Sequence, residues 1–214
     1  MSDFDLIYED NALLVFNKPS GLLSVPGKGP EKADCLRTRV QQVYPEALTV
    51  HRLDMSTSGI LLMARSAALH RTLSIAFQDR EVKKRYVAVV DGRMLENPSQ
   101  EWQLIDKPIA TDWINRPLQK IDTIEGKPSQ THYKIISYDA ATDTTRLELA
   151  PITGRTHQLR VHLQSLGHPI LGDHLYASPV VMAKSARLML HASQLTFTHP
   201  VTGDALDLHC AAPF

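Results

Sequence analysis

The residues best suited to chemistry lie in the stretch His51-Arg52-Leu53-Asp54, which is followed by the segment Thr57-Ser58-Gly59 with its two hydroxyl groups. An apolar run from 60 to 64 comes directly after, and we expect it to form a buried strand. Loops held at the ends of strands by a rigid sheet often carry catalytic groups. The residues alone leave two interpretations open: a catalytic loop built around the Asp54 carboxylate, or a structural turn in which Arg52 pairs with Asp54.

A second polar cluster spans residues 151–162 and contains His157, Arg160 and His162. His157 and Arg160 are three residues apart, so they share one face of a helix. His157 and His162 are five residues apart with no carboxylate between them, which argues against a metal site. Hydrogen bonding in the core is the alternative role for the histidines.

A third feature is the run Lys83-Lys84-Arg85-Tyr86, where an aromatic residue follows three cations at the start of an expected strand. The chain has 23 Lys and Arg against 23 Asp and Glu, so its formal net charge is zero. Nucleic-acid binding would therefore depend on local basic surface, for which residues 80–85 and 151–172 are the candidates. The alternatives are ordinary solvated faces for both segments and a purely structural Tyr86 packed in the sheet.

The composition is typical of a globular protein: of 214 residues, 43% are apolar and 21% charged. This length suits one large domain or two small ones. The longest apolar runs fall far short of the roughly 20 residues that span a bilayer, and the acidic N-terminus lacks the features of a secretory signal. Cys35 and Cys210 have no metal-type spacing. We therefore expect a cytoplasmic protein with reduced thiols and no membrane partner.

Hydrophobic periodicity and turn residues predict many short strands and few helices. The expected strands cover 6–9, 13–16, 60–64, 85–91, 131–138, 145–149, 195–198 and 205–208, with short strands at best between 94 and 127. The expected helices run to 43 from a cap at Asp34, from a cap at Ser66 to 79, and from 156 to 166 before Gly167. Strands and helices do not alternate, so we expect an α+β fold with a largely antiparallel mixed sheet and flanking helices.

Residues 51–54 together with 57–59 resemble the signature of the RluA family of pseudouridine synthases. Two further motifs of that family follow in the same order: 84–86 resembles its tyrosine motif and 154–162 its arginine motif. Shorter similarities extend the match, at 17–22, 22–27, 112–117, 171–173, 190–192 and 199–200. The similarity to the compact members of the family implies a single catalytic domain over 1–214, with no S4 domain ahead of it.

The resemblance implies an enzyme that isomerises uridine in RNA and needs neither a cofactor nor a metal. It implies that Asp54 is the nucleophile and that Arg160 keeps the Asp54 carboxylate charged. Tyr86 would stack on the uracil, and removal of the C5 proton by Tyr86 is a hypothesis. Arg52, beside the nucleophile, is expected to enter the space left by the flipped base.

Substrate binding is expected from a larger set of residues near the three motifs, and the cations among them are expected to contact phosphates. The set comprises His51, Leu53, Thr57, Arg155, His157, Arg116, Lys83, Lys84 and Arg85. The implied substrates are a tRNA anticodon stem-loop and a similar hairpin of 23S rRNA, bound by a monomer.

Three alternatives remain open. The enzyme could act on only one of the two RNAs, or the scaffold could serve as a non-catalytic RNA-binding or folding chaperone. A hydrolase with an aspartate nucleophile would require a second carboxylate or a metal site, and the sequence shows neither near the motifs.

Overall fold

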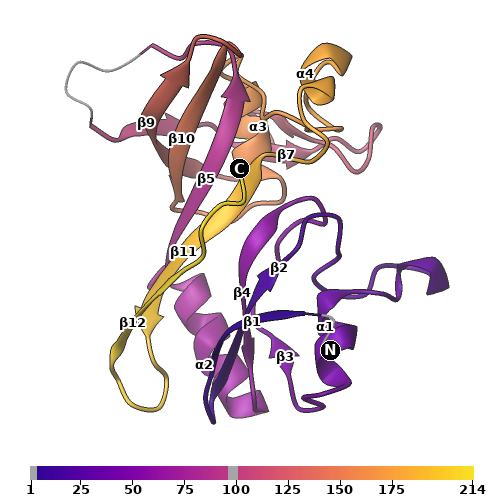
Figure 1. Ribbon diagram of the computed structural model, residues 1–214, viewed down its shortest axis with the longest axis vertical. Coiled ribbons are helices and arrows are strands. Elements are labelled where there is room, and N and C mark those ends of the chain that lie inside the picture. The colour runs from indigo at the N-terminus through magenta and orange to yellow at the C-terminus, as the bar shows by residue number, and fades with distance from the viewer. Residues whose placement is uncertain (1–3, 96–100) are drawn as a thin grey trace. The chain divides into compact units, whose positions relative to one another are not determined.

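In the computed structural model, which describes residues 4–95 and 101–214, the chain forms two compact units. One consists of residues 4–84 with 191–213, and the other of the described residues between 85 and 190 with Phe214. Each unit contains several β-strands (Figure 1) and has its own apolar core. The α+β class with a mixed sheet is as predicted, whereas a single domain over 1–214 stays a prediction.

The first unit is a mixed sheet with a helix on each face. Its strands are β1 (Asp5–Glu9), β2 (Leu13–Lys18), β3 (Leu48–Thr49), β4 (Ser58–Ala64), β11 (Leu190–Thr198), whose first residue belongs to the second unit, and β12 (Ala205–His209). Its helices are the 3-10 turn η1 (Pro30–Lys32), α1 (Leu36–Gln41) and α2 (Ala67–Gln78). The strand order is β1-β2-β4-β11, with β3 beside β4 and β12 beside β11. Strands β4 and β11 run parallel, and the other pairs are antiparallel.

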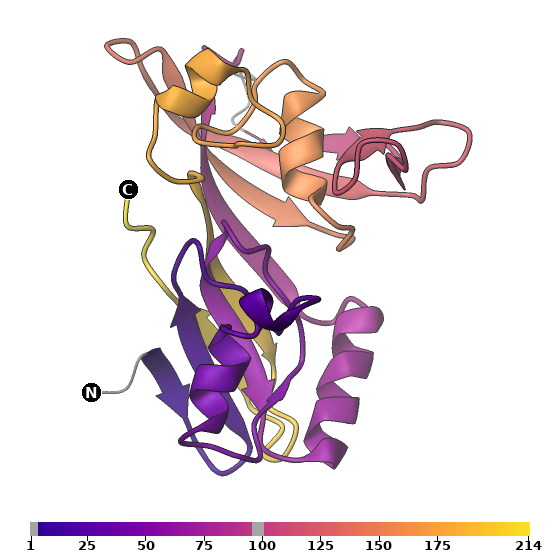
Figure 2. The same cartoon turned by 90° about the vertical axis from the view of Figure 1, so that its right-hand side faces the viewer.

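Strand β4 is buried on both faces, because its alternate side chains enter two different cores. Ile60 and Leu62 pack with the apolar stripe of α2. Leu61 and Met63 pack with α1 on the other side. Figure 2 shows the two helices flanking the strands. This double burial explains the unbroken apolar run of β4, and it gives the loop ahead of the strand a rigid attachment.

Helix α2 begins and packs as the sequence predicts. The Ser66 hydroxyl accepts a hydrogen bond from the Leu69 amide at 3.3 Å, which satisfies one of the exposed N–H groups of the first turn. Leu69, Leu73 and Phe77 lie three or four residues apart and pack into the core shared with β4.

The predicted cap of α1 is wrong by one residue. Cys35 caps this helix: its sulfur accepts from the Thr38 amide at 3.4 Å, and the Thr38 hydroxyl accepts from the Cys35 amide at 3.1 Å. Asp34 instead forms a two-pronged ion pair with Arg39, at 2.7 and 2.8 Å. The helix thus starts at Leu36, so the Cys35 thiol and not the Asp34 carboxylate stands at the capping position.

Close contact between β4 and β11 requires a glycine at position 59. Gly59 has a φ of 111°, and a Cβ there would lie 2.2 Å from the Ala192 carbonyl oxygen. One residue earlier, the Ser58 hydroxyl bonds His191 Nδ1 at 2.8 Å, and His191 Nε2 donates to the Cys210 carbonyl at 3.1 Å. Ser58 and Gly59 therefore hold β4 against β11, so packing explains why the motif contains these two residues.

The second unit is an antiparallel sheet covered by α3. Its elements are β5 (Lys83–Asp91), whose first two residues belong to the first unit, β6 (Gln103–Asp106), β7 (Ile109–Thr111), β8 (Gln119–Ile121), β9 (Gln130–Asp139), β10 (Thr144–Pro151), α3 (Gln158–Gln164) and α4 (Pro179–Ala183). The strand order is β5-β10-β9-β6, and β7 and β8 form a separate hairpin. Short strands occupy 94–127 as predicted, apart from residues 96–100, which lie outside the described residues.

Helix α3 is shorter at both ends than the predicted 156–166: it covers Gln158–Gln164. His157 lies in the left-handed region with a φ of 54°, so the helix begins at Gln158. Gly167, with a φ of 84°, follows its last turn. Leu159 and Leu163 pack into the core formed with β5 and β10. Among the described residues, no helix has the length and apolarity needed to cross a membrane.

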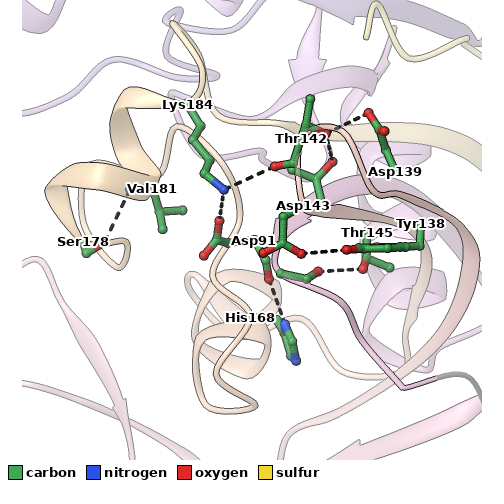
Figure 3. A network of polar contacts seen from close by, with 12 residues as sticks. Asp91, Tyr138, Asp139, Thr142, Asp143, Thr145, His168, Ser178, Val181 and Lys184 are labelled. Carbon is green, nitrogen blue, oxygen red and sulfur yellow. Dashed lines mark hydrogen bonds and ion pairs between the residues drawn. The ribbon is translucent and has the colours of Figure 1, made fainter.

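A polar network attaches the segment after α3 to the sheet (Figure 3). The Lys184 ammonium binds the Asp91 carboxylate at the end of β5 at 2.6 Å. His168 Nδ1 donates to the Asp91 carbonyl at 2.8 Å, and Val181 of α4 packs on Val89 and Leu171. The segment from 168 to 184 is therefore fixed at both ends.

His51 lies between β4 and α2, ahead of the loop that carries Asp54. Its Nε2 accepts the Leu62 amide at 3.0 Å, and its ring stacks on Phe77 with centroids 4.6 Å apart. Burial, with a smaller contribution from the charge of Lys84, lowers the pKa of His51 to about 3. The imidazole is thus neutral in the folded protein, with its proton on Nδ1.

We expect His51→Gln to weaken the dependence of stability on pH between pH 6.5 and 4.5. In this range the unfolded state binds a proton at His51, with an ordinary pKa of about 6.5, whereas the folded state does not because its pKa is about 3. Wild-type stability should therefore fall as the pH is lowered, and the contribution of His51 to that fall should grow toward a limit of about 1.4 kcal/mol per pH unit. Urea unfolding at a series of pH values measures it.

The control variant is Leu69→Ala, which weakens the same helix contact without removing a titratable group. It should lower the free energy of unfolding by a similar amount at every pH. Equal slopes for wild type and His51→Gln would contradict the assignment of a neutral, buried imidazole.

Candidate functional site

Asp54 lies in a loop whose backbone is hydrogen-bonded on both sides of it to the loop of residues 19–24. On the near side, the Ser24 hydroxyl donates to the Leu53 carbonyl at 2.7 Å and accepts from the Leu53 amide at 3.0 Å. On the far side, the Gly21 amide donates to the Met55 carbonyl at 2.8 Å. These bonds fix the backbone at Asp54 while its side chain stays partly exposed.

Lys18 at the end of β2 is fully buried, which is rare for lysine. Its ammonium donates to the carbonyl oxygens of Pro19 at 2.9 Å, Leu22 at 2.7 Å and Met55 at 3.1 Å. Three N–H groups thus meet three carbonyls, which offsets the cost of burial. A positive charge consequently lies against the residue that follows Asp54. The sequence analysis predicted no role for Lys18 beyond its place in the segment 17–22, which is similar to the family.

The four residues around Asp54 differ in their placement. Arg52 is exposed, whereas the side chains of Leu53 and Thr57 are buried and that of His51 stacks on Phe77. For His51, Leu53 and Thr57, these placements favour a structural role in holding the loop, rather than the predicted contact with substrate.

Arg160 on α3 is 2% exposed and pairs with Asp173, which is fully buried. Its Nε donates to Asp173 Oδ2 at 2.8 Å and its Nη2 to Oδ1 at 2.6 Å. Burial would raise the pKa of Asp173, but the hydrogen bonds and charge of Arg160 and two backbone amides hold that pKa below its ordinary value. Asp173 is therefore ionised. The sequence analysis did not predict a role for Asp173, and its only signal was that the segment 171–173 is similar to the family.

The Asp173 carboxylate is committed to Arg160. A carboxylate held in a two-pronged pair cannot readily exchange a proton near neutral pH. Among residues 4–95 and 101–214, no group of three His, Cys, Asp or Glu side chains could hold a metal ion. His162, for its part, bonds Thr131 Oγ1 at 2.9 Å and the Lys107 carbonyl at 3.0 Å, which is the core role considered for the histidines.

Tyr86 on β5 is half-buried and lies opposite Leu149 of β10. It packs against the core that also contains Leu159 and Leu163 of α3. The strand of the tyrosine motif and the helix of the arginine motif thus share one core. His157, predicted to bind substrate, places its Nδ1 2.7 Å from the Tyr176 hydroxyl.

The cations at the start of β5 differ in exposure. Lys83 is exposed, and Lys84 is half-buried, with a pKa lowered by burial and then by the charge of Arg80. Arg85 stacks on Trp102 at 4.3 Å from the ring centroid and faces Glu148 at 3.7 Å. Lys83 is therefore the one of these three that is most open to a phosphate.

The turn between β7 and β8 carries exposed aromatic and cationic groups, on a hairpin that projects from the unit (Figure 2). Trp113 is 70% exposed and Ile114 is 93% exposed. The Arg116 guanidinium lies 3.8 Å from the centroid of the Trp113 ring. Arg155, ahead of α3, is also exposed. Stacked cations and rings of this kind bind unpaired bases and phosphates.

Known proteins resemble this chain over almost its whole length. Residues 12–165 match the family model described as RNA pseudouridylate synthase. The chain is 51% identical to the dual-specificity RNA pseudouridine synthase RluA of Escherichia coli (strain K12), over 98% of this chain and 93% of the relative. It is 50% identical to the protein of the same name from Yersinia pestis, over 98% of this chain and 99% of the relative.

Solved structures agree with the sequence relatives. Human RNA Pseudouridylate Synthase Domain Containing 1 superimposes with a TM-score of 0.82 at 29% identity, over 100% of this chain and 85% of that one. Human RNA Pseudouridylate Synthase Domain Containing 4 superimposes with a TM-score of 0.74 at 25% identity, over 98% of this chain and 88% of that one. The predicted family is thus confirmed by a match over most of the chain: the protein belongs to the RNA pseudouridylate synthase family, whose members are RNA-modifying isomerases.

Proposed function

We propose that this protein converts specific uridines to pseudouridine in a tRNA anticodon stem-loop and in a similar hairpin of 23S rRNA, as a monomer in the cytoplasm. The relatives that are about half identical to it carry the name dual-specificity RNA pseudouridine synthase. The observation that carries the proposal is the Asp54 loop, which is hydrogen-bonded on both sides of a partly exposed carboxylate.

The reaction breaks the bond between ribose and the uracil nitrogen, turns the ring, and reattaches it through C5. Only protons exchange with solvent, so the balance of the reaction requires no redox cofactor. We assign Asp54 as the nucleophile that carries the substrate through the break. The fixed backbone of its loop favours this role, because a nucleophile held near its attack geometry reacts faster.

Arg160 and Tyr86 are the proposed partners of Asp54. Arg160 would keep the carboxylate charged and oriented, which its own fixed, buried position favours. Tyr86 would stack on the uracil. An ordinary tyrosine has a pKa of about 10, which suits a base at neutral pH poorly, so stacking is the role that we propose first.

A paired or stacked uridine must flip out of the RNA stack to reach Asp54, at a cost of a few kcal/mol. Arg52 is exposed and adjacent to Asp54. We propose that it occupies the position that the flipped base leaves. Lys83, Lys84, Arg85, Arg155 and Arg116 are the proposed phosphate contacts, and Trp113 beside Arg116 extends that surface to unpaired bases.

Asp54→Asn tests the catalytic proposal, because the amide keeps the size of the side chain but cannot act as the nucleophile. Transcripts of the anticodon stem-loop and the rRNA hairpin are incubated with the pure protein, and pseudouridines are mapped by carbodiimide-stop sequencing. We expect wild type to modify both RNAs and the variant to lose activity by on the order of 10³-fold or more. RNA binding should persist.

The matched control is Asp79→Asn, at the exposed end of α2, which should keep full activity. A variant at position 54 that still forms pseudouridine would refute the nucleophile. Wild-type protein that remodels RNA without modifying it would favour the chaperone, and modification of one RNA alone would narrow the substrate.

Arg116→Gln tests the proposed RNA surface. Loss of one phosphate contact should reduce the slope of log affinity against log salt by about 0.7 to 0.9, and weaken binding to both RNAs. Fluorescence anisotropy over a salt series measures this. Arg39→Gln, which breaks the ion pair with Asp34 on α1, is the control and should leave the slope unchanged. An unchanged slope for Arg116→Gln would remove the hairpin from the interface.

A further inference from the structure

Arg160 is held by two acceptor oxygens of one carboxylate. The guanidinium has five N–H donors in a single plane, and Asp173 takes one from Nε and one from Nη2. A two-pronged contact fixes the plane and the rotation of the group, which one hydrogen bond would not do. The direction of the remaining donors is thereby set.

Asp173 is itself oriented by the backbone around it. Its Oδ1 also accepts the amides of Leu175 at 2.9 Å and Tyr176 at 3.2 Å. The preceding residue, Gly172, has a φ of 70°, and a Cβ there would lie 2.0 Å from the Arg187 carbonyl oxygen. The turn that carries Asp173 therefore packs tightly against the neighbouring segment, and the carboxylate has a fixed place.

The Tyr176 ring lies against the guanidinium of Arg160. The Arg160 Cζ atom lies 5.1 Å from the centroid of the Tyr176 ring, which favours the cation electrostatically. The Tyr176 hydroxyl accepts the Gln119 amide at 2.9 Å and lies 2.7 Å from His157 Nδ1, to which it can donate its own proton. Residues from β8 and from the start of α3 thus fix the ring that covers Arg160.

We propose that Asp173 and Tyr176 are positioning residues, which hold Arg160 in the orientation that pseudouridine formation requires; this rests on the proposed function. Neither residue is catalytic, because each acts through Arg160. His157 and the Gln119 amide act one step further out, through the Tyr176 hydroxyl. A purely stabilising role explains the arrangement less well, since a buried ion pair often contributes little to stability compared with apolar packing.

Asp173→Asn removes one charged acceptor and keeps the shape. We expect kcat for the anticodon stem-loop to fall by roughly 10²-fold, the scale of a small misplacement of a catalytic group, with an unchanged KM. In an Arg160→Lys background, where the two-pronged contact is already lost, Asp173→Asn should cost much less. Asp91→Asn, which breaks the Lys184 pair in the same unit, is the matched control and should leave kcat unchanged.

Tyr176→Phe keeps the ring and removes the hydroxyl. It tests the positioning of Arg160 even if the Asp173→Asn variant does not fold. We expect a smaller fall in kcat than for Asp173→Asn, without a change in KM. Tyr133→Phe, which removes another buried hydroxyl that donates to Gln103 at 2.7 Å, should keep full activity. A Tyr176→Phe variant with wild-type kcat would overturn the proposal for Tyr176.

The Nε–H signal of Arg160 in ¹⁵N NMR provides a readout independent of activity. It should exchange slowly in wild type and rapidly in Asp173→Asn. Normal kcat in a folded Asp173→Asn variant, or equal losses in the wild-type and Arg160→Lys backgrounds, would overturn the role of Asp173. If wild type forms no pseudouridine while the signal responds as expected, the proposed function fails and the positioning of Arg160 by Asp173 stands.

Discussion

A buried cation is tolerated in a protein only when its N–H groups are hydrogen-bonded, and each unit of this protein is built around one such cation. Lys18 in the first unit places its ammonium on three carbonyl oxygens, one of which belongs to the residue after Asp54. Arg160 in the second unit is paired with the buried Asp173. Because an unpaired buried charge would cost several kcal/mol, the partners of each cation are held in place as firmly as the cation itself.

The apolar cores supply the rigidity that these polar contacts require. Strand β4 enters a core on each of its faces, so the loop ahead of it starts from a strand that cannot tilt or slide without opening one of the two. Helix α3 is anchored by Leu159 and Leu163 on either side of its buried arginine. Packing thus determines where the polar groups are, and hydrogen bonds determine how they point.

Charge is distributed differently at the surface. The chain has no net charge, and its cationic side chains at the surface include those at the start of β5 and at the β7–β8 turn. Several of them lie against aromatic rings, as Arg116 does on Trp113 and Arg85 on Trp102. A neutral protein with stacked cations can bind the unpaired bases of an RNA loop without coating duplexes indiscriminately, which suits an enzyme that modifies particular uridines.

Most of the local structure, and the family, could be predicted from the order of the amino acids. Period-two and helical patterns located most of the strands and helices, because burial of one face imposes that spacing, and three ordered motifs identified the candidate residues. The prediction failed at the cap of α1, where Asp34 pairs with Arg39, a contact that depends on side-chain geometry.

Which polar groups meet could not be predicted and becomes visible in the folded chain. The Arg160–Asp173 pair joins residues 13 apart, and Lys18 reaches a carbonyl 37 residues away. No local pattern encodes such contacts, because a lysine or an aspartate next to a strand is ordinarily solvated. Their burial follows from how strands and loops distant in sequence pack together, and it is this packing that turns residues of a motif into an oriented site.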